Sequence, residues 1–308
     1  MKLPEELQFI QNSRMPQKTT NSRMDGKICV ITGATSGIGY EAAKRLAQGG
    51  AHIVMVCRSK EKALKVQEEL AREFDCTVDI FIADFLHLAE VSLVADEISK
   101  KYPKIDVLIN NAGMFNKRRR LTPDGNEMVF QVIHLASFLI TRVLADNLKS
   151  GAPSRILDIN SEAHRFGGLN IQDLTWARRP YIGLRAYGAA KIAQLLVAWE
   201  LADQLKGSGV TINAMHPGAV RTNIGMNNGI LYRLYNRFIL RWFLKDPAIS
   251  GEAIYYLAAA PELEKVSGRF FNQTIEEKPA SHALDRGLGG KVWEISEQLI
   301  MPNMGGER

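Results

Sequence analysis

The chain has 308 residues, of which 46% are hydrophobic and 23% charged, a composition typical of a globular protein with a sizeable core. Its 39 basic and 33 acidic residues give a net charge of +6, and no nucleic-acid-binding motif accompanies this mild excess, so we expect no nucleic-acid partner. The amino terminus lacks an apolar signal-peptide core, and no apolar run reaches about 18 residues, so neither a secretory signal nor a membrane-spanning helix is expected.

Residues 27–39, KICVITGATSGIG, combine a strand, a glycine-rich turn and the start of a helix. The run 28–32 is apolar and rich in β-branched residues, as in a buried strand, and a helical pattern begins at Ile38. A glycine-rich turn before a helix N-terminus presents backbone N–H groups to an anion such as a pyrophosphate. The segment therefore predicts a dinucleotide-phosphate site formed by Gly33, Thr35, Ser36, Gly37, Ile38 and Gly39.

Strands and helices alternate along the rest of the chain. Further strands are expected at 51–56, 77–83, 105–109, 155–159 and 210–215, and helices at 60–74, 88–100, 125–148 and 185–205. This alternation predicts an α/β fold, namely a single-domain, doubly wound parallel sheet of the Rossmann type with helices on both faces. Ligands bind such sheets at the carboxyl ends of the strands. Residues 1–24 are expected to be an extension, partly helical and partly loose.

Three cysteines, Cys29, Cys57 and Cys76, lie in or beside the apolar strand-like runs and lack the spacing of a metal site. Their odd number argues against a disulfide framework. We therefore expect buried thiols in a reducing compartment, a cytoplasmic location and no bound metal.

Polar or glycine residues follow nearly every expected strand, and two of them bear on the cofactor. Arg58 lies nineteen positions after Gly39, where a carboxylate would bind a ribose 2′-OH. A guanidinium there pairs instead with a 2′-phosphate, which favours NADP(H) over NAD(H); the alternative is a solvated surface arginine. Asp84, followed by Phe85, is either an adenine contact or a helix cap.

Tyr187 and Lys191 lie four residues apart on an expected helix and so share a face. An ammonium beside a phenol lowers the phenol's pKa from about 10 toward neutrality, which would make Tyr187 an acid or base. The alternative is a surface pair that arose by chance. Ser161, at the end of the strand 155–159, is a donor that would orient a carbonyl oxygen.

Taken together and in order, TGATSGIG, NNAG, Ser161, YGAAK and HPGAVRT resemble a classical short-chain dehydrogenase/reductase over about residues 25–300. The resemblance implies that Tyr187 donates or accepts the proton, that Lys191 lowers its pKa and holds the nicotinamide ribose, and that Ser161 polarises the substrate carbonyl. It also implies cofactor contacts on the adenosine side and at the nicotinamide end. These residues are Asn111, Ala112, Gly113, Pro217, Gly218, Val220 and Thr222.

Within this family the chain is most similar to the retinol-dehydrogenase-type branch, through VCRS, LTPDGNEMVFQV, SEAHRFG and WEISEQL. The interval of 26 residues from Ser161 to Tyr187 implies an inserted loop, as in that branch. One departure is Ile133, at a position where the family usually has an asparagine whose carbonyl holds a water next to the lysine. Either the proton relay is slower, or Ser137, one turn away, positions a replacement water; the alternative is that the family tolerates the change.

Residues 230–245 carry Arg233, Arg237, Arg241 and Lys245 at every fourth position among many apolar side chains. Three interpretations stay open. They are a lid over a lipophilic substrate, spanning about 223–246, a basic amphipathic helix in peripheral contact with an anionic membrane, and a core-packed helix with a solvated face. The basic run 117–120 would either attract an acidic substrate or form a solvated loop.

The sequence thus predicts an N-terminal extension, 1–24, and a Rossmann-type domain, 25–303. We expect an NADP(H)-dependent oxidoreductase that interconverts a small lipophilic alcohol and its ketone or aldehyde. The alternative is a weakly catalytic or non-catalytic NADP(H)-binding sensor or scaffold, which Ile133 alone favours. By analogy with the family, the helices 125–148 and 185–205 would pair between two subunits of a homodimer.

Overall fold

A computed structural model of the protein describes residues 12, 15–220 and 245–304. Its centre is an eight-stranded sheet in the order β3-β2-β1-β4-β5-β6-β7-β8. Neighbouring strands are parallel from β3 to β7, and β8 runs antiparallel to β7. The strands are β1 Ile28–Thr32, β2 His52–Cys57, β3 Val78–Ile82, β4 Val107–Asn110, β5 Ser154–Ile159, β6 Val210–His216, β7 Phe270–Asn272 and β8 Ile275–Glu277.

The doubly wound parallel sheet expected from the sequence is therefore confirmed, and the six expected strands are all present. The short strands β7 and β8 extend the sheet beyond the expected edge, and the antiparallel β8 departs from the all-parallel expectation. Strands β1 to β3 are added toward one side of the sheet and β4 onward toward the other, so the strand order reverses between β1 and β4, and open α/β sheets bind their ligands at such a point.

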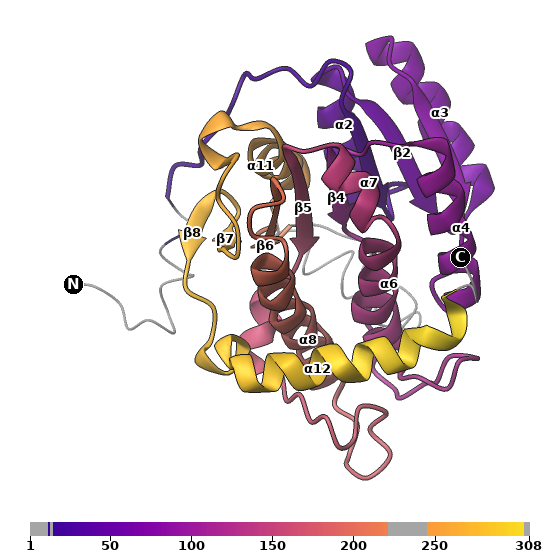
Figure 1. Ribbon diagram of the computed structural model, residues 1–308, viewed down its shortest axis with the longest axis vertical. Coiled ribbons are helices and arrows are strands. Elements are labelled where there is room, and N and C mark those ends of the chain that lie inside the picture. The colour runs from indigo at the N-terminus through magenta and orange to yellow at the C-terminus, as the bar shows by residue number, and fades with distance from the viewer. Residues whose placement is uncertain (1–11, 13–14, 221–244, 305–308) are drawn as a thin grey trace.

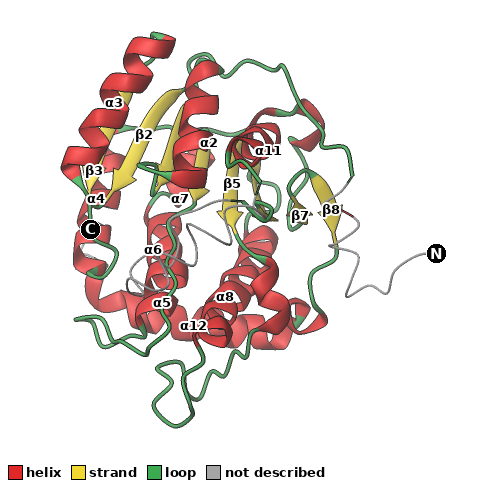
Figure 2. Cartoon of the chain, turned by 180° about the vertical axis from the view of Figure 1, so that it is seen from behind, coloured by secondary structure: helices red, strands yellow, loops and turns green. Residues whose placement is uncertain are grey.

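Helices cover both faces of the sheet (Figures 1 and 2). One face packs against α2 Gly37–Gln48, α3 Lys60–Phe74 and α11 Ala248–Ala259, and the other against α4 Leu88–Lys101, α6 Ala136–Val143 and α8 Gly183–Gln204. Each strand therefore presents alternate residues to two separate cores. On β5, for example, Ile156 faces the layer of α6 and α8, whereas Leu157 faces the layer of α2 and α11.

The segment 125–148, expected as one long helix, is interrupted twice, so this expectation is wrong in detail. A short α5, Met128–Phe130, leads into a π-helical turn, Gln131–Leu135, before α6, and α7 Ala145–Ser150 follows a break at Leu144. The N–H of Ala136 donates to the carbonyl of Gln131, five residues earlier. Ile133 lies in the middle of the π turn and is fully buried.

The C-terminal helix α12, Arg286–Ile300, crosses the outer side of α6 and α8 (Figure 1). It contacts α6 through an edge-to-face pair formed by Trp293 of α12 and Phe138 of α6, whose ring centroids are 4.9 Å apart. An ion pair of 2.7 Å between Arg142 and Glu297 adds to this contact. The homodimer expected from the sequence would pair the helices 125–148 and 185–205 between subunits, and a dimer formed on this side of them would have to include α12.

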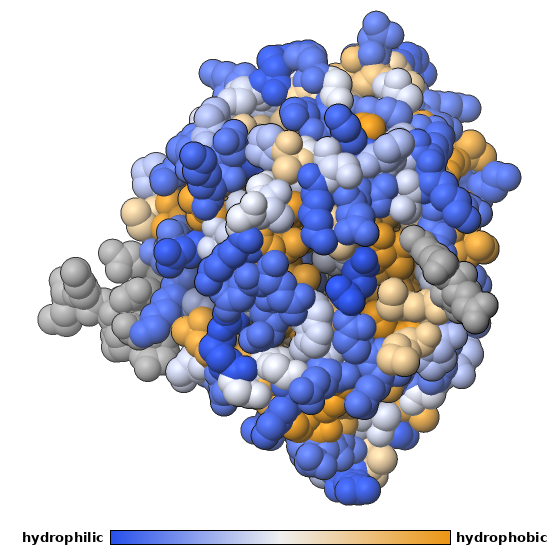
Figure 3. Space-filling view, in the orientation of Figure 1, coloured by the Kyte–Doolittle hydropathy of each residue, from blue (hydrophilic) through white to orange (hydrophobic). Residues whose placement is uncertain are grey.

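The described part of the N-terminal extension runs along the domain surface. The backbone N–H of Lys18 donates to Thr274 Oγ1 over 2.8 Å, and the Tyr255 hydroxyl donates to the carbonyl of Ser22 over 2.5 Å. The face of the molecule in Figure 3 is of mixed hydropathy, with hydrophilic residues predominating. Among the described residues, none of the helices combines the length and the apolar character that crossing a membrane requires.

Candidate active site

The predicted site residues gather at one edge of the sheet. Because β1 to β6 are parallel, the residues that directly follow them lie along the same carboxyl edge. In strand order this edge carries Asp84, Arg58, Gly33, Asn111, Ser161 and Pro217. The arrangement therefore places the glycine-rich turn beside Asn111, at the point where the order of the strands reverses.

The glycine-rich turn allows an unusually close approach of α2 to β1. Gly33 has a φ of 72°, which favours glycine, and a Cβ on Gly39 would lie only 2.4 Å from the Gly33 carbonyl oxygen. Ser36 is the N-cap residue of α2, and its exposed side chain makes no capping hydrogen bond. The first turn of α2 therefore presents unpaired backbone N–H groups and a free hydroxyl to an anion.

Asn111 fastens this turn to the end of β4. Its Nδ2 donates to the carbonyls of Thr32 and Gly33, over 2.8 and 3.2 Å. In return, the Thr32 hydroxyl accepts hydrogen bonds from the backbone N–H groups of Asn111 and Ala112. Gly113 follows these residues on the same loop. The two strands that flank the reversal point are thus joined by polar contacts directly below the candidate phosphate site.

Arg58 and Asp84 occupy the outer part of the same edge. Arg58 is exposed, and its guanidinium makes no hydrogen bond or ion pair with another residue of the part of the chain that the structure describes. Asp84 accepts a hydrogen bond from the N–H of Leu86 over 3.1 Å, and its own N–H donates to Glu90. Asp84 therefore stabilises the turn before α4, while Arg58 is available to an anionic ligand.

Ser161, Tyr187 and Lys191 are brought together by a close contact between α8 and the 3₁₀ turn Glu162–Phe166. A Cβ on Gly188 would lie 2.4 Å from the carbonyl oxygen of Ala163, so the turn rests directly on the helix. As a result, the side chains of Ser161 and Tyr187 share a hydrogen bond. The ammonium of Lys191 lies 5.9 Å from the centroid of the Tyr187 ring.

The electrostatics of the pair differ from the sequence-based expectation. Burial raises the pKa of Tyr187 to about 12, opposed by its hydrogen bond with Ser161. Burial also lowers the pKa of Lys191 to about 7. Lys191 Nζ donates to the carbonyl of Ile159 over 2.5 Å and to Gln194 Oε1 over 3.2 Å. Within the protein itself, the pKa of Tyr187 is therefore raised, and the expected lowering by Lys191 is wrong. The phenol is protonated at neutral pH and can act as an acid.

A buried polar network that the sequence analysis did not single out lies beneath Lys191. Asn160 Nδ2 donates to the Lys191 carbonyl over 3.0 Å and to Gln194 Oε1 over 3.1 Å. Asp158 is also buried and accepts a hydrogen bond of 2.8 Å from Asn110 Nδ2. A carboxylate among the apolar residues Ile156, Leu157 and Ile159 was the available signal, because buried strands rarely carry one.

The residues after β6 form the far end of the edge. The Ser250 hydroxyl donates to the Pro217 carbonyl over 2.6 Å, and Gly218 has a φ of 92°. Val220 is buried and pairs with Lys245 in an isolated β-bridge. Thr222 and nearly all of the expected lid, 223–246, lie outside the described residues.

One aromatic side chain contacts Tyr187, and apolar and basic side chains are exposed on segments close to it in the chain or joined to the inserted loop. Phe115 meets the Tyr187 ring edge-on, with the centroids 6.1 Å apart, and Phe166, Ile182 and Leu184 are exposed nearby in the chain. The basic run 117–120 is exposed and joins the inserted loop through a hydrogen bond from Arg119 Nε to the Thr175 carbonyl. The three cysteines are free thiols, and Cys76 is only partly buried. No cluster of three or more potential metal ligands occurs in the described ranges.

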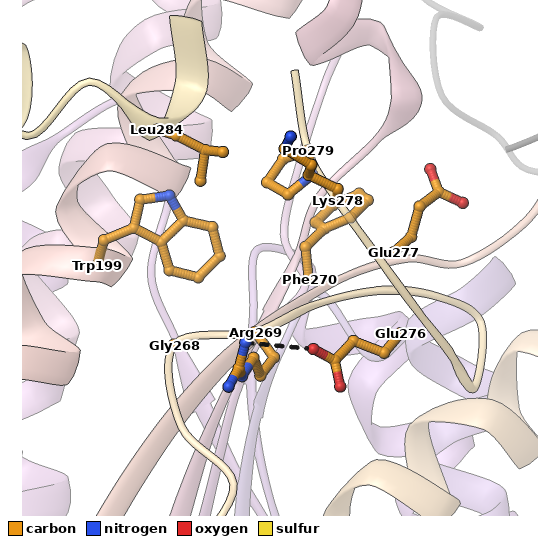
Figure 4. A pocket seen from close by; sticks show the side chains of 9 residues that line it. All are labelled: Trp199, Gly268, Arg269, Phe270, Glu276, Glu277, Lys278, Pro279 and Leu284. Carbon is orange, nitrogen blue, oxygen red and sulfur yellow. Dashed lines mark ion pairs between the residues drawn. The ribbon is translucent and has the colours of Figure 1, made fainter. Parts of the chain in front are cut away.

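A cavity of about 400 Å³ lies beside β7 and β8, the last two strands of the sheet (Figure 4). The Trp199 indole forms one wall, and an ion pair of 3.4 Å between Arg269 and Glu276 lies at another. None of its lining residues is a predicted site residue, so the chemistry proposed below does not depend on it.

Comparison with known proteins gives one consistent result. Residues 27–230 match the family model described as short chain dehydrogenase. Retinol dehydrogenase 13 of Homo sapiens is 36% identical over 297 residues, covering 95% of this chain and 89% of that protein. Retinol dehydrogenase 14 of Mus musculus is 38% identical over 292 residues, covering 90% and 86%. A crystal structure of a putative uncharacterized protein from Mycobacterium Paratuberculosis superposes with a TM-score of 0.72 at 30% identity, covering 93% of this chain and 98% of that one.

Proposed function

The chain belongs to the short-chain dehydrogenase family, within its retinol dehydrogenase branch, and we propose that it is an NADP(H)-dependent oxidoreductase that interconverts a lipophilic alcohol and its ketone or aldehyde. The observation that carries this proposal is the grouping of Ser161, Tyr187 and Lys191 at the same sheet edge as the glycine-rich turn. Members of the family interconvert alcohols and carbonyl compounds, so the finer points of the proposal are the cofactor, the substrate class and the residue roles.

The residues present fit a nicotinamide dinucleotide. The approach of α2 to β1, which a single Cβ on Gly39 would block, leaves room for a pyrophosphate against backbone N–H groups. Gly33, Thr35, Ser36, Gly37, Ile38 and Gly39 would hold the phosphates, with Asp84, Phe85 and 111–113 on the adenosine side and Pro217, Gly218, Val220 and Thr222 at the nicotinamide end. When bound, the cofactor supplies the hydride that adds to the substrate carbon or accepts the one that leaves it.

Tyr187 would supply or receive the proton. Its phenol is protonated at neutral pH, so in the reductive direction it donates its O–H proton to the carbonyl oxygen as the hydride arrives. The Ser161 hydroxyl, which shares a hydrogen bond with Tyr187, would donate to the same oxygen and hold it in line. Lys191 would hold the nicotinamide ribose and, with its pKa of about 7, act as a proton source near Tyr187.

A lipophilic substrate is supported by the side chains around Tyr187. Phe115 lies against the phenol ring, and Phe166, at the end of the 3₁₀ turn, and Ile182 and Leu184, at the start of α8, are about half exposed. An aromatic contact to the catalytic phenol, with exposed apolar residues on the adjoining 3₁₀ turn and the first turn of α8, is what a site for an apolar ligand would offer. Turnover should therefore be sought with a panel of long-chain and aromatic aldehydes and ketones, including a retinoid aldehyde because the relatives are named as retinol dehydrogenases. Binding of the dinucleotide with no turnover across such a panel would favour the sensor alternative.

Replacing Arg58 with alanine should weaken NADP(H) binding by about 10- to 100-fold, the effect of losing one or two charge-assisted hydrogen bonds, and leave NAD(H) binding unchanged. Arg58 is exposed at the end of β2, where its guanidinium can reach a 2′-phosphate. Fluorescence titration with both reduced cofactors gives the two affinities. Arg72→Ala, which removes an exposed arginine from the far end of α3, is the control. Equal losses for NADPH and NADH, or no loss, would contradict the proposed cofactor preference.

The contact of 230–245 with a membrane concerns residues outside those described, except Lys245, and stays a prediction. If it forms, the protein should co-sediment with vesicles that contain anionic lipid at low salt and be released at about 0.5 M salt, since screening weakens surface charge attraction. Binding that does not depend on salt or lipid charge would contradict a charge-driven contact. The homodimer and the cytoplasmic location also stay predictions.

A further inference from the structure

Asp158 is a carboxylate on a strand that is buried on both faces. It is 5% exposed and lies opposite Asn110 in the parallel pairing of β4 with β5. Two residues earlier on β5, Ile156 packs into the core formed with α6 and α8. Because side chains alternate along a strand, Asp158 points to that same face, toward α8 and Lys191.

The hydrogen-bond partner of Asp158 on the sheet is neutral. Asn110 Nδ2 donates to Asp158 Oδ1 over 2.8 Å, and it also donates to the Thr141 hydroxyl on α6 over 3.0 Å. A buried carboxylate held by one amide recovers little of the free energy that it loses on leaving water. It therefore needs an opposite charge nearby, or it takes up a proton.

Lys191, on α8, is likewise a buried charged group whose hydrogen-bond partners are neutral. It is 3% exposed, and its Nζ donates to two neutral acceptors, the carbonyl of Ile159 and Gln194 Oε1. Ile159 directly follows Asp158, so the ammonium lies against the end of β5 that carries the carboxylate. Among the described residues, Lys191 and Asp158 are the charged groups that act on each other across this interface, since the facing positions on β4 and α6 are Asn110 and Thr141.

Each group favours the charged form of the other: Lys191 favours the carboxylate of Asp158, and Asp158 favours the ammonium of Lys191. Burial raises the pKa of Asp158 to about 6, against the pull of Asn110 and Lys191. Burial lowers the pKa of Lys191 to about 7, against the pull of Asp158. Without the carboxylate, a lysine at this depth would lose its charge at still lower pH. The charge on Lys191 near neutral pH therefore depends on Asp158, a residue buried within the sheet.

We propose that Asp158 is a positioning residue that keeps Lys191 in its ammonium form and holds it at the floor of the site, beside Tyr187. The neighbouring α-helical layer offers no polar side chain at Ile133, where the resemblance described above implies an asparagine, so the lysine is supported from the strand side. This inference rests on the proposed roles of Tyr187 and Lys191.

The first test is the titration of Lys191 itself. In protein labelled with ¹³C-lysine, the resonance of Lys191 is assigned by its absence from Lys191→Met. Asp158→Asn keeps an oxygen that can accept from Asn110 but removes the charge, so the Lys191 midpoint should fall by about one pH unit or more. Asp106→Asn is the matched control: Asp106 pairs with Lys27 at the opposite, amino edge of the sheet, and its loss should leave the Lys191 midpoint in place. An unchanged midpoint in Asp158→Asn would overturn the proposal.

A reciprocal measurement covers the case in which Asp158→Asn does not fold. In protein labelled at the aspartate carboxyl, Lys191→Met should move one elevated aspartate midpoint further upward, because coupling between two sites is mutual. If no aspartate midpoint moves, the pairing is refuted.

Turnover separates this inference from the proposed function. The alkaline limb of the pH–rate profile should move to lower pH in Asp158→Asn by the same amount as the lysine midpoint, whereas a purely structural defect would lower the rate equally at every pH. If the Lys191 midpoint is lower in Asp158→Asn than in the wild type, but the wild type shows no turnover, only the proposed function is refuted. If the wild type turns over substrate, but Asp158→Asn changes neither the Lys191 midpoint nor the alkaline limb of the pH–rate profile, only the role of Asp158 is refuted.

Discussion

Replacing Tyr187 with phenylalanine should lower kcat for carbonyl reduction by about 10²- to 10⁴-fold, the usual contribution of a positioned general acid, with little change in dinucleotide affinity. The ring would keep its contact with Phe115 and its place in α8, because only the hydroxyl is removed. The substrate oxygen would then lose its proton donor, while the phosphate site some distance away on α2 is untouched.

The measurement is NADPH consumption at saturating substrate, together with the dinucleotide affinity from fluorescence. Tyr181→Phe is the matched control, since it removes the same atom six residues earlier, where the hydroxyl donates to Glu127 Oε1 over 3.1 Å. Equal losses in the two variants would show that the phenol at 187 has no special role. Full turnover in Tyr187→Phe would remove the basis of the proposed chemistry.

The raised pKa of Tyr187 also gives the sign of the pH dependence. Reduction needs the protonated phenol, which burial stabilises. A fall of the rate near neutral pH should therefore report the loss of the Lys191 proton, and ionisation of Tyr187 itself should lower the rate only at alkaline pH. Oxidation of the alcohol needs the phenolate, so its rate should rise with pH over the same range. The positive charge of a bound oxidised nicotinamide would move the oxidative rise to lower pH.

The first βα unit was predictable because its signals are local. The β-branched run 28–32 and the glycines 33, 37 and 39 specify a strand, a turn and a helix within thirteen residues, and the structure has β1 and α2 there. The Tyr187–Lys191 pair was predictable for the same reason, since helical periodicity alone puts the two on one face. The direction of the Tyr187 pKa shift was not, because it depends on burial depth and on the Ile159 carbonyl that takes the lysine's hydrogen bond.

Other features depend on contacts distant in sequence. Strands β7 and β8 have only three residues each and include Asn272 and Glu277, so no alternating pattern marks them. The packing of α12 depends on contacts such as that of His134 Nε2 with Ser296 Oγ, 162 residues apart in the chain. The π turn 131–135 looks helical by every local criterion, and only its i to i+5 hydrogen bond distinguishes it.

Replacing Gly39 with alanine should weaken the binding of both NADP(H) and NAD(H) by about 100-fold or more, the effect of a displacement of about 1 Å in a preorganised site. The new Cβ would lie 2.4 Å from the Gly33 carbonyl oxygen and 2.4 Å from Asn111 Nδ2. The first of these is backbone and is fixed by β1, so α2 must move away from the sheet. The N–H groups of its first turn would then no longer meet a phosphate at hydrogen-bonding distance.

Helix propensity opposes this effect but is too small to cancel it. Alanine favours an α-helix over glycine by about 1 kcal/mol, so the variant should fold, and its defect should appear in binding. Gly290→Ala is the control, because Gly290 lies in α12 and a Cβ there meets nothing within 4 Å. It should bind both dinucleotides as the wild type does. Wild-type affinity in Gly39→Ala would mean that the phosphates do not rest on α2, and the cofactor would then have to lie elsewhere on the sheet edge.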